Sequence, residues 1–252
     1  MGVHCCWLPP RQVEKCLYGS VGVAAPRDWS DLLHPKFKGR IAFPASSRGL
    51  VGIALKTLGL GFNSNANDLR AWGVSETALK KRVQELKRQA LLFDDREHVR
   101  AFAFGDAWLV VGSSLDVMAL SATVSQARLF VPASGTTLWA DLFVQPSSSK
   151  ATRDPGEPSP LIPAWLDFIL SPSRSVTTTG LKSGLSPLLL PDTGAEGAPG
   201  QACGSGMNGT EGLNVALDVK GRFLPPGCVL QRSEFLLPLD RETTDLYNRM
   251  LG

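Results

Sequence analysis

The chain has 252 residues, enough for one large domain or two small ones, and 43% of these residues are hydrophobic. A chain of this composition can bury a core, which excludes disorder over its whole length. The net charge of +3, without a dense run of lysine and arginine, argues against a nucleic acid or an anionic membrane as the partner.

The first half of the chain alternates between strand and helix patterns, which favours an α/β fold. The expected elements are a strand over 39–44, a helix from Ser46 or Ser47 to Gly59, a helix opened by Ser75, a brief buried strand over 91–93, a helix over 96–104, and strands over 108–111 and 128–131. A further helix is expected to begin after Gly112, between the last two strands.

Beyond Pro146 the periodicity weakens. The sequence predicts a linker over 147–160, a helix over 162–170, a mobile loop over 191–212, a strand over 213–219 and a closing helix over 241–251. The loop assignment rests on a Gly-rich composition without periodicity.

Cysteine, histidine and apolar runs give no sign of a metal or a membrane. The five cysteines show no C-x-x-C spacing and only three histidines occur, so we expect no metal site and no cofactor. A disulfide between Cys203 and Cys228 stays open. No apolar run is long enough to span a bilayer, and the N-terminus lacks the basic-then-apolar shape of a signal peptide.

The segment 135–146 contains the pair of residues most suggestive of a ligand site. It has the pattern of a strand that leaves a glycine turn, and Trp139 and Asp141 stand two residues apart on it. Residues with that spacing share one face of a strand, so an indole and a carboxylate would lie together. Such a pair suits an organic ammonium, through charge-assisted hydrogen bonds and a cation–π contact. The alternative is a buried Trp139 beside an aspartate that caps a turn.

Several short motifs occur in an order that resembles a known family. They are Asp28-Trp29-Ser30-Asp31-Leu32, Pro35 to Ala42, Gly105-Asp106-Ala107-Trp108 and Leu138-Trp139-Ala140-Asp141. Their order and spacing resemble the spermidine/putrescine-binding proteins, which are the solute receptors of polyamine ABC importers. The likeness extends over about 19–146 and again over about 162–187.

The resemblance implies an α/β fold like that of the periplasmic binding proteins, with one near-complete lobe and a partial second lobe. On this basis 18–26 is the hinge crossover strand, preceded by an unassigned N-terminal segment, 1–17. Segments 27–139 and 187–252, the latter with the mobile loop 191–212, form lobe two. Segment 140–186 is a returning remnant of lobe one.

The resemblance also assigns ligand contacts. Trp139 matches a family aromatic that stacks on the polyamine, and Asp141 matches an acid that pairs with an amine. Ser46 and Gly49 occupy positions where relatives carry carboxylates, so two charges are missing. Asp95 aligns near a small polar contact and could replace part of that charge, while Ser113 falls near a second stacking position. The expected substrate-binding residues are therefore Trp139, Asp141, Asp95, Ser113 and Ser46.

The expected function is polyamine binding as the solute-binding component of an ABC transport system, with weak affinity because charges and most of one lobe are missing. Permease subunits are the implied protein partners, and the periplasm (or a plastid, for an organellar relative) is the implied compartment. The residues do not distinguish spermidine from putrescine. Three alternatives stay open: a fragment without ligand, an interaction protein of the same fold, and a receptor for another solute, such as an anion held by serines at helix N-termini. An enzyme is not expected, because the sequence has no nucleophile elbow or Walker loop.

Overall fold

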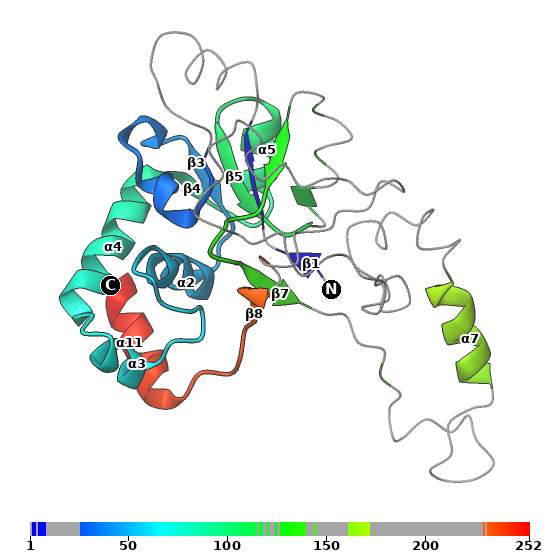
Figure 1. The fold of residues 1–252 in the computed structure, drawn as a ribbon. Coiled ribbons are helices and arrows are strands. Elements are labelled where there is room, and N and C mark those ends of the chain that lie inside the picture. Colours follow the sequence, from blue (N-terminus) through cyan, green and yellow to red (C-terminus); the bar gives the residue numbers. More distant parts are fainter. Residues whose placement is uncertain are drawn as a thin grey trace, which may run out of the picture.

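The computed structural model describes residues 2–3, 5–8, 26–114, 127–139, 161–171 and 231–252, with the single positions 116, 117, 120, 124, 144 and 229. Its elements in chain order are β1 (Gly2–Val3), β2 (Cys5–Leu8), η1 (Trp29–Leu33), η2 (Pro35–Phe37), β3 (Ile41–Phe43), α2 (Ser47–Thr57), α3 (Ala66–Ala71), α4 (Glu76–Gln89), β4 (Ala90–Phe93), α5 (Glu97–Ala103), β5 (Leu109–Gly112), β6 (Arg128–Phe130), β7 (Thr137–Trp139), α7 (Leu161–Leu170), β8 (Glu234–Phe235) and α11 (Arg241–Leu251) (Figure 1).

A five-stranded sheet with the order β4-β3-β5-β2-β6 forms the centre of the fold. Its strand β3 is parallel to both β4 and β5, whereas β2 runs antiparallel between β5 and β6. The carboxyl ends of β3, β4 and β5 therefore meet at one edge of the sheet, and the connecting helices begin there.

Alternation along the strands separates two core layers. The side chains of Ile41, Phe43, Leu109 and Val111 belong to a cluster with α2, α4 and α11, whereas Ala42 and Val110 belong to a second cluster with α5. Helices thus cover both faces of the parallel strands, as an α/β fold requires. Figure 1 shows α2, α4 and α11 side by side on the first face.

Local capping explains where two of these helices begin. Ser46 precedes α2, and its Oγ accepts a hydrogen bond of 3.0 Å from the backbone N–H of Gly49. Ser75 does the same for α4, where its Oγ accepts from the N–H of Ala78 at 3.1 Å. The prediction that Ser46 or Ser47 caps the first helix and that Ser75 opens the next is confirmed.

A second, three-stranded sheet has the order β1-β7-β8, with β7 antiparallel to β1 and parallel to β8. The turn before β7 contains Gly135 at φ +92°, and a Cβ at that position would lie 2.2 Å from the carbonyl oxygen of Arg232. Only glycine fits there, because it tolerates positive φ and leaves room for the returning backbone. The predicted strand after a glycine turn is therefore confirmed over 137–139.

The remaining predicted elements within the described residues are also present, with one difference in burial. Strand β4 was expected to be buried, but Leu91 is 40% and Phe93 is 39% exposed, because β4 lies at the edge of the sheet. Strands β1, β2 and β8 and helix α3 were not predicted from the sequence. The helix expected after Gly112 is represented by helical residues at 114, 116, 117 and 120.

Several expectations lie outside the described residues. They are the crossover strand over 18–26 (all but residue 26), the linker over 147–160, the mobile loop over 191–212, the strand over 213–219 and the Cys203–Cys228 pair. The division into lobes at 27–139, 140–186 and 187–252 stays a prediction. Among the helices that the structure describes, none combines the length and apolar character needed to cross a membrane.

Candidate functional site

Three of the expected ligand contacts follow the carboxyl ends of neighbouring parallel strands. Ser46 follows β3, Asp95 follows β4 and Ser113 follows β5. Ligands of α/β sheets bind at this edge, because strand ends and helix N-termini converge there. The structure brings two of the three into direct neighbourhood, since Asp95 Oδ1 accepts a 2.8 Å hydrogen bond from the N–H of Ala45, the residue before Ser46.

Two of these side chains also have local structural roles. Ser46 caps α2, but a hydroxyl that accepts one hydrogen bond can still donate its own proton. Ser113 Oγ donates to Asp116 Oδ2 at 2.7 Å and accepts from the N–H of Asp116 at 3.3 Å, so it caps the helix after β5. Asp95 is exposed to solvent at the edge of the sheet.

Trp139 ends β7, in the second sheet. Its indole Nε1 is buried and has no hydrogen-bond partner among the residues that the structure describes, although the side chain as a whole is partly exposed. Asp141 lies outside the described residues, so the pairing of the indole with this carboxylate stays a prediction. Thr137 stands two residues before Trp139 on the same strand and is 5% exposed.

A cavity of about 60 Å³ lies between α2, β3, β5 and β7. Its apolar wall includes Trp29, Phe43, Leu50, Ile53, Phe62 and Val111. Its polar lining includes the residues Ser46, Thr136 and Thr137. Of the expected contacts, Ser46 therefore lines the cavity. Asp95 lies next to it, because its carboxylate accepts a hydrogen bond from Ala45, the residue before Ser46.

Trp29 is buried and fixes one side of this cavity. Its Nε1 donates a 2.8 Å hydrogen bond to the carbonyl of Gly135, and its ring meets Phe62 edge-on at 6.1 Å. Asp28 supports the same turn, because its Oδ1 accepts from Ser134 Oγ at 2.6 Å. The Asp28-Trp29 motif thus positions the start of β7, a role that the sequence did not predict.

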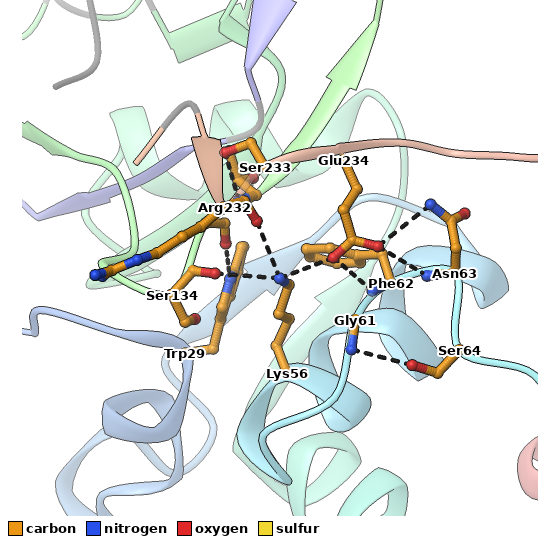
Figure 2. A network of polar contacts seen from close by, with 12 residues as sticks. Trp29, Lys56, Gly61, Phe62, Asn63, Ser64, Ser134, Arg232, Ser233 and Glu234 are labelled. Atoms are coloured by element: carbon orange, nitrogen blue, oxygen red, sulfur yellow. Dashed lines mark hydrogen bonds and ion pairs between the residues drawn. The ribbon is translucent and has the colours of Figure 1, made fainter. Parts of the chain in front are cut away.

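An ion pair lies against Phe62, one of the residues that line the cavity (Figure 2). Lys56 Nζ lies 2.9 Å from Glu234 Oε1 and also donates to the carbonyl oxygens of Ser134 and Arg232 at 3.1 and 3.3 Å. Glu234 Oε1 additionally accepts from the backbone N–H of Phe62 at 3.1 Å. This network joins α2 to β8.

The charge state of Glu234 follows from these contacts. Burial by itself would raise the pKa of its carboxyl group, but the hydrogen bonds from Lys56 and from the N–H groups of Phe62 and Asn63 outweigh burial and lower the pKa. Glu234 is therefore ionised at neutral pH and holds β8 in place. Leu236, two residues on, reaches the cavity lining. The sequence carried no local signal for this pair, because its members are far apart in the chain.

Metal chemistry has no support in the described ranges, where no three His, Cys, Asp or Glu side chains gather into a group that could hold an ion. The groups available at the edge of the sheet are hydroxyls, exposed carboxylates and aromatic faces. Such a set binds small organic molecules through hydrogen bonds and stacking.

Comparison with known proteins agrees with this arrangement. A family model described as bacterial extracellular solute-binding protein matches residues 19–193. The spermidine/putrescine ABC transporter substrate-binding protein PotD of Streptococcus pneumoniae superposes with a TM-score of 0.69 at 17% identity, and the match covers 99% of this chain and 65% of that one. A Listeria monocytogenes protein assigned as a spermidine/putrescine ABC transporter gives a TM-score of 0.63 at 16% identity, with the same coverage. No curated protein matches the chain.

At these identities the structural matches show the fold, and they confirm the predicted α/β fold of the periplasmic-binding-protein type. The chain spans 65% of the length of both structures. The family model covers more than half of the chain. The chain therefore belongs to the bacterial extracellular solute-binding protein family, whose members bind substrates rather than transform them.

Proposed function

We propose that the chain acts as the solute-binding component of an ABC-type importer and that its solute is a polyamine, spermidine or putrescine. The observation that carries the proposal is the placement of Asp95 beside Ser46 at the carboxyl edge of β3 and β4. The fold shared with PotD supports the same solute class. Permease subunits are the proposed partners, and the extracellular family description supports a periplasmic location.

In this proposal, one ammonium group of the polyamine binds the Asp95 carboxylate. Asp95 Oδ1 accepts one hydrogen bond from Ala45, and an ionised carboxylate has the capacity for several more. Trp139 supplies a ring face for the methylene chain, and Asp141 supplies a second carboxylate. Both assignments come from the family pattern.

The expected affinity of this chain is low. An exposed ion pair contributes about 0–1 kcal/mol and a cation–π contact about 0.5–2 kcal/mol. Their sum lies below the roughly 4 kcal/mol that a millimolar dissociation constant requires. Binding in the millimolar range therefore requires additional packing of the methylene chain.

Isothermal titration of spermidine into the folded chain tests the proposal. We expect saturable heats at millimolar ligand, reduced at least severalfold in Asp95→Asn and in Asp141→Asn. Asp245→Asn, a change of the same type on the exposed surface of α11, is the control and should leave the heats unchanged. Flat heats from a chain with native circular dichroism would reject polyamine binding. A parallel titration with sulfate tests the anion alternative.

A further inference from the structure

Among the residues that the structure describes, none that lines the cavity beside Asp95 is charged. The twelve described residues of its lining are apolar, hydroxyl-bearing or glycine. The walls bring together the aromatic rings of Trp29, Phe43 and Phe62, and the hydroxyls belong to the serine and threonines named above. An ammonium group that entered this space would lose its water without meeting a carboxylate of the described lining, which is strongly unfavourable.

The charge-free cavity and the carboxylate are adjacent. Ser46 lines the cavity, and the N–H of the preceding residue, Ala45, donates to Asp95 at 2.8 Å. Thr137, which comes from a different segment of the chain, also lines the cavity and is almost fully buried. The site therefore has two parts. One is the anionic carboxylate of Asp95, which is bound to Ala45, and the other is the uncharged cavity, which begins at the next residue, Ser46.

A ligand that fills both parts must be charged at one end and uncharged at the other. Putrescine and spermidine have ammonium groups at both ends, and an ammonium placed in the interior would meet none of the carboxylates that the structure describes. A short acyl amide suits the interior, because its carbonyl oxygen can accept from the hydroxyls of Ser46 and Thr137 and its methyl group can pack on Phe43 and Ile53. A cavity of about 60 Å³ has room for roughly four or five water-sized groups, enough for such an end.

We propose that the preferred ligand is a mono-N-acylated diamine, with its free ammonium on Asp95 and its acyl group in the cavity. This inference rests on the proposed amine-binding function of the same site and narrows its substrate class. Putrescine and N-acetylputrescine form a matched pair of probes. They share the four-carbon chain and differ at one end only, which is an ammonium in putrescine and a neutral acetamide in N-acetylputrescine.

Isothermal titrations of the full chain with both probes test the inference. We expect N-acetylputrescine to bind on the order of tenfold more tightly than putrescine. Equal affinities, or a preference for putrescine, would overturn the inference and leave the proposed function standing. If neither probe nor spermidine binds to the folded chain, both the inference and the proposed function fail.

Variants locate the selectivity in the cavity. Leu50→Phe places a larger side chain on the cavity wall, and Leu58→Phe makes the same change at the end of α2, away from the lining. The ratio of the two affinities should fall towards one in Leu50→Phe and stay as in the parent chain in Leu58→Phe. Thr137→Val removes a hydroxyl at nearly constant volume and should also lower the ratio, which keeps the test intact if Leu50→Phe does not fold. An unchanged ratio in Thr137→Val and Leu50→Phe would contradict the proposed placement of the acyl group.

Discussion

Lys56 and Glu234 form an ion pair of 2.9 Å between α2 and β8, two elements that are far apart in the chain. The lysine side chain is only 8% exposed and the glutamate side chain 26%, so the pair is largely shielded from water. Lys56 also contacts the ring face of Phe62, with 5.2 Å between Nζ and the ring centroid. The pair therefore connects the C-terminal segment to the wall of the cavity.

Removing the charge of Glu234 should destabilise the fold. In Glu234→Gln the Lys56 ammonium loses its counter-ion in a mostly buried position, and we expect a loss of about 1–3 kcal/mol in the free energy of unfolding. Urea denaturation followed by circular dichroism measures this loss. Glu85→Gln removes a more exposed bridge with Arg82 on α4 and should cost less than about 1 kcal/mol. A Glu234→Gln chain as stable as the parent would show that the pair has no net stabilising effect.

The same pair predicts how stability depends on pH. The pKa of Glu234 is lowered in the folded chain relative to its usual value of 4.5, so the folded state favours the ionised carboxylate. The stabilisation is therefore fully present above about pH 4.5 and is lost as the pH falls through the folded-state pKa. The difference in stability between the parent chain and Glu234→Gln should be constant near neutral pH and should shrink below pH 4.5. A difference that grows on acidification would reverse the assigned sign.

Local signals explain which parts of the fold could be predicted from the sequence. The caps at Ser46 and Ser75 and the glycine turn at Gly135 involve neighbours in the chain, and their elements appear where expected. Strand β8 and its pairing with β7 were missed, because their partners are about a hundred residues apart. Helix α3 was missed too, although Asn65 and Asp68 form a capping box that marks its start.

In the candidate site, too, the features with local sequence signals were predicted and those formed by distant residues were not. Sequence order placed Ser46 and Asp95 after successive strands, and the parallel pairing of β3 with β4 brings them together. The cavity could not be predicted, because Trp29, Phe62 and Thr137 come from three separate segments that only tertiary packing joins. The ion pair of Lys56 was missed for the same reason.

Gly135 should tolerate no side chain. Its φ of +92° disfavours any other residue, and an added Cβ would lie 2.2 Å from the carbonyl oxygen of Arg232. We expect Gly135→Ala to lower the free energy of unfolding by more than about 2 kcal/mol, since strain and a backbone clash add. Gly73→Ala is the matched control, because Gly73 has φ +68° but open space around it, and it should cost about 1 kcal/mol. Equal thermal shifts in the two variants would show that the backbone relaxes away from the clash.

A carboxylate at position 46 should strengthen amine binding without loss of the helix cap. Aspartate caps helices as well as serine does, so Ser46→Asp should keep the stability of α2, whereas Ser46→Ala should cost about 1 kcal/mol. The new charge would stand next to Asp95 at the same edge of the sheet, and we expect the affinity for spermidine to rise severalfold at low ionic strength and less at high salt.

The control for this gain is Ser75→Asp, which adds the same charge at the N-cap of α4. If both variants raise the spermidine affinity equally, the effect comes from net charge alone. If only Ser46→Asp raises it, the ammonium binds at the carboxyl edge of β3, because the two variants match in net charge and in capping geometry and differ in location.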